Sequence, residues 1–389
     1  MAGSDEGMEV AVAPSDTAST TAGGPATAPL EEALKRLARG VPTALAGLLH
    51  DVESHAVIEG TKVTAHCHCL KLDGNGRPRI EDLVKVVAEH VLDYAIPRSQ
   101  IREADEEYVR TRSTQKLVRL ANDAKELFTD LEQSGEGGEL LLFALAEKIL
   151  RLPQLICKMN LKTNTRMHVH GADGLHAGVD SATGKLLLFW GESKIYGDVI
   201  GAVREYHASV APMLAEYAAG QRVLQLLQRH ANLDDSALEK ALKKFLDPDS
   251  EEFNSLEFRG LCLVGFDCDA YPKGPSTAEL AVLAKQNATT LPKWKGHVKK
   301  RIAEEKLDAF AMHFLFVPFP SAEGFRQLLR DQLGVGTQAA TAAPTPAPAA
   351  PPAATDAKLT RGRRAAPVSN VSPRQPRAPK LKGTPSGAA

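Results

Sequence analysis

The stretch Leu186-Leu187-Leu188-Phe189-Trp190-Gly191-Glu192-Ser193-Lys194 decides how this sequence is expected to fold. Its pattern is typical of a β-strand, in which residues two apart point to the same face. Trp190, Glu192 and Lys194 therefore share a face with Leu188, and the two apolar members direct that face toward the core. Charged groups are rarely placed at the end of such a face without a partner or a ligand, because burial of an unpaired charge is costly. The end of this strand is a candidate site.

A second strand-like run, Met167–Leu175, precedes the first and is separated from it by a turn around 181–184. If the two strands pair as a hairpin, Asp173 approaches Glu192. Two converging carboxylates repel each other, and a divalent cation relieves that repulsion. Carboxylate oxygens suit Mg²⁺ or Mn²⁺, and a neighbouring lysine can stabilise negative charge on a phosphate. Asp173, Glu192 and Lys194 thus form the D…ExK arrangement of enzymes that hydrolyse phosphodiesters.

A third carboxylate, Glu139, opens the helix that we predict over Glu139–Leu150. This helix is apolar almost all round, which indicates that it is buried. Two interpretations of Glu139 remain open. It is either an acid stabilised by the helix dipole at the N-terminus, or a further ligand of the metal or of a water molecule.

The remainder of the central region is predicted as α/β. Strands are expected at Thr61–Leu72, Gly260–Phe266 and Ala311–Phe319, and helices at Ile80–Tyr94, at 100–132 and at Asp198–Leu227 with an interruption at Pro212. We divide this region into an N-terminal α/β part, 31–133, packed on a core, 134–336. The ends, 1–30 and 337–389, are expected to be disordered, because they are rich in small residues or proline and bury too little apolar surface. The first tail is acidic and the second is basic.

Charge and composition exclude several classes of protein. Lys and Arg number 47 against 48 Asp and Glu, which gives a formal net charge of -1 and excludes binding to nucleic acid by bulk charge alone. The longest apolar run, Leu140–Ala146, is far short of the roughly 18 residues that a membrane span needs. Five cysteines without a CxxC pair indicate reduced thiols, so we expect a cytoplasmic protein that does not enter a membrane.

Several segments of the sequence resemble the HamA family, the nuclease subunits of the Hachiman antiphage defence system. The resemblance covers roughly 45–335. The segments that carry it are Gly138–Leu142, Lys158–Thr163, His170–Gly174, Gly191–Tyr196, Phe316–Pro320 and Gly324–Arg326. It implies a PD-(D/E)xK-type nuclease core with a mixed central sheet in αβββαβ order, metal-dependent cleavage of DNA, and a helicase as partner.

Transferred by residue, the resemblance assigns Glu139 as the helix carboxylate, Asp173 and Glu192 as metal ligands, and Lys194 as the catalytic lysine. The backbone carbonyl of Ser193 is expected to complete the site for Mg²⁺ or Mn²⁺. The sequence departs from the nominal motif at Ala172, where the motif has proline before the aspartate. We also expect contacts to substrate from His170, His176 and Lys158.

Two other functions remain alternatives. The chain can be a non-catalytic adaptor with a nuclease-like fold that binds DNA or a helicase. It can also be a zinc-dependent hydrolase that uses His168, His170 and His176, although their spacing departs from the HxHxDH pattern of those enzymes. The sequence leaves open whether single- or double-stranded DNA is cut, whether RNA is accepted, and whether the chain forms oligomers.

Overall fold

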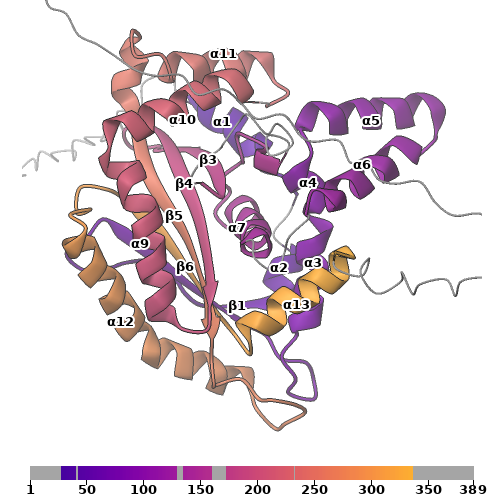
Figure 1. The fold of residues 1–389 in the computed structure, drawn as a ribbon, viewed down its shortest axis with the longest axis vertical. Coiled ribbons are helices and arrows are strands. Elements are labelled where there is room, and N and C mark those ends of the chain that lie inside the picture. Colours follow the sequence, from indigo (N-terminus) through magenta and orange to yellow (C-terminus); the bar gives the residue numbers. More distant parts are fainter. Residues whose placement is uncertain (1–27, 41–42, 129–134, 160–171, 232, 336–389) are drawn as a thin grey trace, which may run out of the picture. The chain divides into compact units, whose positions relative to one another are not determined.

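The computed structural model describes residues 28–40, 43–128, 135–159, 172–231 and 233–335 (Figure 1). These residues belong to one compact unit of the chain, Met1–Thr341, and the second unit, Ala342–Ala389, lies outside them. The expected tails, 1–30 and 337–389, therefore lie almost wholly outside the described residues. The exception is 28–30, where the expectation of disorder is wrong because helix α1 (Ala28–Leu37) begins there and buries Leu30.

A six-stranded mixed sheet in the order β1-β2-β6-β5-β4-β3 forms the centre of this unit. The neighbours β2, β6, β5 and β4 run parallel, whereas β1 and β3 pair antiparallel at the two edges. The two parts predicted as 31–133 and 134–336 both contribute strands to this one sheet. The strands are β1 (Leu49–Val57), β2 (Val63–Leu70), β3 (Gly174–Val179), β4 (Leu186–Tyr196), β5 (Leu256–Asp267) and β6 (Met312–Phe319).

Helices cover both faces of the sheet, as Figure 1 shows. Helices α7 (Glu136–Lys148), α3 (Ile80–Glu89) and α13 (Ala322–Leu333) pack on one face, and α9 (Val199–Ala215) and α12 (Leu280–Glu304) pack on the other. The core strands are apolar on both sides because both sides are covered. Side chains of β4 alternate accordingly: Leu187 and Phe189 join the core under α7, whereas Leu188 and Trp190 join the core under α9.

The expected α/β class with a mixed sheet flanked by helices is confirmed. The finer αβββαβ order stays a prediction. In the part of the chain that the structure describes, α7 is followed by the helical residues 158–159 and then by the strands β3 and β4, and 160–171 lies outside that part. Of the expected strand Met167–Leu175, 167–171 lies outside the described residues, and β3 begins at Gly174, after Ala172 and Asp173.

Three predicted helices are divided differently from what we expected. Ile80–Tyr94 splits at His90 into α3 and α4 (Val91–Ala95). The stretch 100–132 contains two helices, α5 (Arg98–Thr111) and α6 (Gln115–Glu126), because Arg112 takes a left-handed φ of 61° that ends the first helix. Pro212 does not interrupt α9, since its carbonyl still accepts the Glu216 N–H at 3.0 Å.

The remaining helices are α2 (Thr43–Leu48), α10 (Tyr217–His230) and α11 (Ser236–Phe245), with a short 3-10 turn at Glu251–Ser255. Among the described residues, no helix combines the length and the apolar character that a membrane crossing requires.

Buried histidines make the fold sensitive to acid. His66 Nε2 lies 3.0 Å from His313 Nδ1, and burial lowers the pKa of His66 to about 3 and those of His313 and His207 to about 4. In the unfolded chain a histidine titrates near pH 6.5. Between about pH 6.5 and 4 the unfolded chain therefore binds protons that the native protein does not, and the free energy of unfolding falls as the pH falls.

We expect the His207→Leu variant to lose less stability than the wild type between pH 7 and 5. The unfolded variant lacks the imidazole that binds a proton in this pH range, so acid favours its unfolding less. Urea unfolding at the two pH values measures the difference. His230→Leu, at a less buried histidine of α10, serves as control. An unchanged pH dependence in His207→Leu would contradict this interpretation.

Candidate active site

The β3–β4 hairpin places Asp173 beside the end of β4, so the strand pairing that we assumed from the sequence is confirmed. Gly174 pairs with Gly191, and the Asp173 N–H donates to the Gly191 carbonyl at 2.8 Å. Beyond Gly191, the Asp173 carboxylate borders this edge of β4. Its Oδ2 accepts hydrogen bonds from Ser193 N and Ser193 Oγ, both at 2.7 Å. Since both backbone groups of a strand residue point to the same side, the Ser193 carbonyl faces this side as well.

Lys158 lies between two carboxylates from different elements. Its Nζ is 3.2 Å from Glu139 Oε1 and 3.3 Å from Asp173 Oδ1. Burial opposes the charge on Lys158, but the two carboxylates outweigh it and raise the pKa of Lys158 above its ordinary value. The sequence predicted Lys158 as a contact to substrate, and the structure places it as the counter-ion of the two predicted acids.

Glu139 is further held by Tyr94 of α4, whose hydroxyl donates to Glu139 Oε2 at 2.5 Å. Tyr94 is fully buried, and burial together with the charge of Glu139 raises its pKa well above the ordinary value, so it stays a donor. Nothing in the sequence around Tyr94 links it to Glu139, 45 positions later. Both Tyr94 and the Ser193 hydroxyl are site residues that sequence reasoning missed.

Glycine allows helix α7 to approach β4 closely enough to deliver Glu139. A Cβ at Gly138 would lie 2.8 Å from Ser193 Oγ, which is closer than side-chain carbons are found to other atoms. The first turn of α7 therefore packs directly against the end of β4. Glu139 itself is buried in the first turn of α7, where the helix dipole favours a negative charge.

Glu192 and Lys194 form an ion pair at the end of β4, with Lys194 Nζ 2.6 Å from Glu192 Oε1. Burial and the charge of Asp173 nevertheless raise the pKa of Glu192 to about 7, against the opposing effects of Lys194 and Lys158. The pKa of Glu192 thus depends on the charges of Asp173 and Lys158 as well as on that of its ion-pair partner Lys194. The site contains three carboxylates and two ammonium groups, so negative charge is in excess.

The donor set suits a hard divalent cation, because it consists of carboxylate oxygens and a backbone carbonyl. As the side chains stand, no three His, Cys, Asp or Glu residues in the described segments converge as ligands of one ion. Lys158 occupies the point on which Glu139 and Asp173 converge. A divalent cation at this point would compete with the Lys158 ammonium group.

The histidines predicted to contact substrate or zinc are not part of this arrangement as far as the structure describes it. His168 and His170 lie outside the described residues. His176 is 1% exposed, its Nδ1 lies 3.0 Å from the Leu152 carbonyl, and its Nε2 is buried without a hydrogen-bond partner, so burial keeps the ring from a substrate at the surface.

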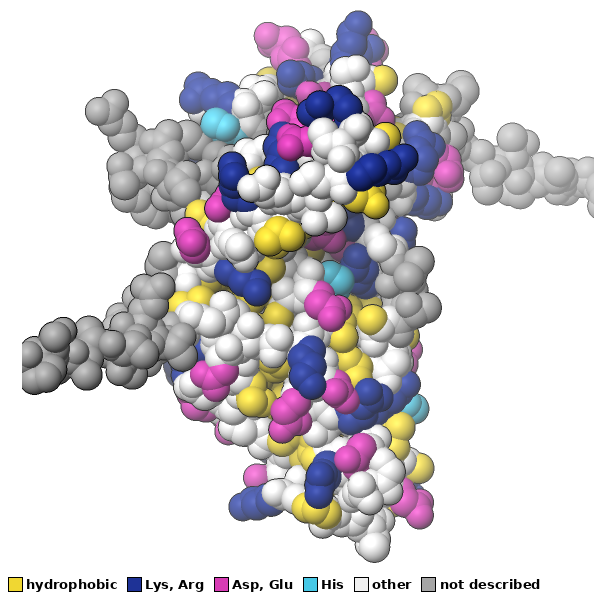
Figure 2. Space-filling view, turned by 90° about the vertical axis from the view of Figure 1, so that its right-hand side faces the viewer, with side chains coloured by type: hydrophobic (Ala, Val, Ile, Leu, Met, Phe, Trp, Pro, Cys, Tyr) yellow, Lys and Arg dark blue, Asp and Glu magenta, His cyan; other side chains and the backbone are white. Residues whose placement is uncertain are grey.

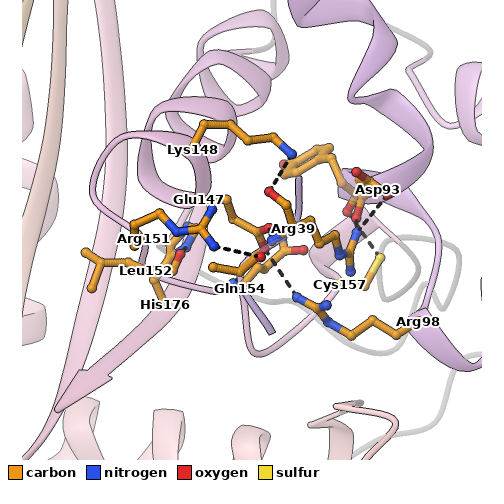
Figure 3. Close-up of polar contacts among 12 residues, drawn as sticks. Arg39, Asp93, Arg98, Glu147, Lys148, Arg151, Leu152, Gln154, Cys157 and His176 are labelled. Carbon is orange, nitrogen blue, oxygen red and sulfur yellow. Dashed lines mark hydrogen bonds and ion pairs between the residues drawn. The ribbon is translucent and has the colours of Figure 1, made fainter. Parts of the chain in front are cut away.

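A buried ionic cluster at the C-terminal end of α7 fixes the helix that carries Glu139 (Figure 3). Glu147 is completely buried. Its Oε1 accepts from Arg98 Nη2 at 3.3 Å and from Gln154 N at 3.0 Å, and its Oε2 accepts from Arg39 N at 2.8 Å. These contacts tie α7 to the segment after α1 and to the start of α5. The cluster lies two helical turns from Glu139 and therefore sets its position.

Comparison with known protein families gives one finding that covers most of the chain. The family model named HamA matches residues 48–333, and every residue of the site lies in that range. A search of curated proteins finds no match.

Proposed function

Because this chain belongs to the HamA family, the Hachiman antiphage defence proteins, we propose that it serves that defence as a metal-dependent nuclease that cleaves DNA. The observation that carries this proposal is the gathering of Glu139, Asp173 and Glu192, from α7, the start of β3 and the end of β4, around Lys158 and Lys194. The carboxylates can bind a divalent cation, and the lysines can neutralise charge on a phosphate. Both roles serve the hydrolysis of a phosphodiester.

Asp173, Glu192 and Glu139, with the Ser193 carbonyl, would hold Mg²⁺ or Mn²⁺. When bound, such an ion activates water and neutralises charge on the phosphate. The protein supplies the rest. The Ser193 N–H and hydroxyl fix the rotamer of Asp173, Tyr94 fixes Glu139, and Lys194 presents an ammonium group next to Glu192 for the phosphate that is attacked.

Competition between Lys158 and the cation leads to a prediction that does not depend on activity. Lys158→Met leaves Glu139 and Asp173 facing each other without a counter-ion. In EDTA we expect this variant to lose about 3 kcal/mol of stability, because a buried ion pair is broken. Magnesium should restore part of the loss, so the melting temperature of Lys158→Met should rise more with Mg²⁺ than that of the wild type.

Thermal unfolding of both proteins with EDTA and with a Mg²⁺ series measures this difference. Lys293→Met, at an exposed lysine of α12, is the matched control. A variant that Mg²⁺ stabilises no more than the wild type would show that no cation enters between Glu139 and Asp173.

The proposal includes a helicase as partner. The formal net charge of -1 gives the chain little bulk attraction for DNA. Figure 2 shows Lys and Arg side chains interspersed with Asp and Glu over the face that it presents, without a field of one sign. Delivery of DNA by a partner would supply the affinity that such a surface lacks.

A binding and cleavage experiment distinguishes the nuclease from a non-catalytic adaptor. Labelled DNA is incubated with the wild type and with Glu192→Gln, in Mg²⁺ and in EDTA, alone and with a candidate helicase partner. A nuclease loses cleavage in Glu192→Gln and keeps its binding of DNA and partner. Binding without cleavage by the wild type, even with the helicase present, would favour the adaptor.

A further inference from the structure

An apolar cavity of about 140 Å³ adjoins the candidate active site. It lies between the β3–β4 hairpin and the helices α9 and α10. Its walls include the buried side chains of Ile156, Leu175, Trp190 and Val223, and two cationic residues, Lys158 and Arg222, also line it. Arg222 belongs to α10 and is exposed, so it stands at the rim.

The cavity adjoins the proposed metal ligands and their counter-ion. Lys158 lines the cavity and also contacts Glu139 and Asp173. Ala172 and Gly174, the neighbours of Asp173 on either side, line it as well. Trp190 and Glu192 lie on the same face of β4 two residues apart, which corresponds to about 7 Å along a strand. A group attached to a phosphate at Glu192 and Asp173 can therefore reach Trp190.

Size and chemistry restrict what the cavity can hold. A volume of about 140 Å³ is below the ~300 Å³ at which pockets for drug-sized ligands begin, and equals that of roughly five water molecules. It admits one flat ring system and excludes a base pair. Apolar walls with an indole favour an aromatic ring, and cations at the rim favour a ring that is attached to an anion.

We propose that this cavity receives one unstacked nucleobase of the strand that is cut, so that the substrate is DNA with unpaired bases at the cleavage position. This inference rests on the proposed nuclease function and names its substrate class. Stacking on an aromatic ring is tolerant of sequence because every base has a π-face, so a preference for unpaired DNA without strong base specificity follows. Arg222, exposed at the rim, would bind a phosphate next to that nucleotide.

Tryptophan fluorescence tests the proposal without cleavage. The chain has two tryptophans. Trp294 is buried under α12 against Phe266 and Phe316, away from the cavity, so Trp294→Phe leaves Trp190 as the only reporter. In EDTA, the variant is titrated with a single-stranded thymidine oligonucleotide, with an abasic oligonucleotide of equal length, and with a blunt duplex. We expect quenching by the first, and binding about tenfold or more weaker for the other two, since the stacked base is lost.

Leu226 lines the cavity and is half-buried, so Leu226→Phe, in the same background, places a ring in the cavity. Gln225→Phe adds the same ring to the exposed side of α10 and serves as control. We expect only Leu226→Phe to reduce binding of the intact single strand to the abasic level. Circular dichroism checks its fold. A second pair of variants compares Arg222→Gln with Arg229→Gln. Only Arg222→Gln should weaken binding of the single strand.

Equal binding of intact and abasic strands, equal binding of the duplex, or unchanged binding in both Leu226→Phe and Arg222→Gln would overturn the proposal. Cleavage in Mg²⁺ combined with any of these results would support the nuclease function and contradict only this substrate preference. Selective quenching by the single strand with no cleavage in Mg²⁺ would support binding of a base in the cavity and contradict the nuclease function.

Discussion

Replacing Asp173 with asparagine is expected to lower the rate of magnesium-dependent DNA cleavage by about a thousandfold or more, because a central ligand of the metal loses its charge. Asn keeps the size of Asp and an oxygen that can accept from Ser193, so the hairpin should fold as before. It cannot neutralise Lys158 or a divalent cation. Initial rates on labelled DNA at saturating Mg²⁺, with equal concentrations of folded protein, measure the effect.

The matched control is Asp308→Asn, at an exposed aspartate between α12 and β6. It should cleave at the rate of the wild type. If Asp173→Asn keeps more than about a tenth of the activity, Asp173 is not a ligand on which the reaction depends, and the site must be sought elsewhere in the chain.

Replacing Glu147 with alanine is expected to lower the free energy of unfolding by about 3–5 kcal/mol, the cost of removing one partner from a buried ion pair. The variant leaves the guanidinium group of Arg98 and the N–H groups of Arg39 and Gln154 without their acceptors in the interior. Arg98 is itself largely buried, and burial lowers its pKa to about 10. Urea unfolding with matched slopes gives the difference.

Glu89→Ala, at an exposed glutamate of α3, is the control and should change stability by less than about 0.5 kcal/mol. Because Glu147 fixes the far end of α7, cleavage by Glu147→Ala should also fall, even where the variant is fully folded. Unaltered stability would mean that the cluster reorganises around the missing carboxylate and does not hold α7.

The parts of the fold that were predictable from sequence are those with strong periodicity. β4, β5 and β6 are apolar on both faces, and most of helix α7 is a continuous apolar run that follows the glycine pair of its first turn. The approach of Asp173 to the end of β4 followed from one assumption, that two strands joined by a short turn form a hairpin, and the antiparallel pairing of Gly174 with Gly191 confirms it.

The strand β1 was missed because it is an edge strand with mostly polar side chains. Its register against β2 shifts twice, between Asp51 and Glu53 and between Glu53 and Ala56, so its pattern does not alternate regularly. The breaks near His90 and Arg112 also escaped prediction, since neither residue is a glycine or a proline.

The contacts that organise the site depend on the tertiary structure and had no local signal. Tyr94 reaches Glu139 only because α4 packs beside α7, and Lys158 reaches both acids only because the segment after α7 returns toward β3. Such partners come from elements far apart in sequence. Spacing along one strand identified the charged residues of β4, whereas their surroundings had to come from the structure.

The most direct test of the proposed nuclease is the fate of supercoiled plasmid at low salt. Purified wild type and the double variant Glu192→Ala/Lys194→Ala are incubated with Mg²⁺ and with EDTA, each alone and with the proposed helicase partner. Nicking or degradation that requires both Mg²⁺ and the intact pair is the predicted result. Cleavage that survives in the double variant, or in EDTA, would contradict the assignment of the site to Asp173, Glu192 and Lys194.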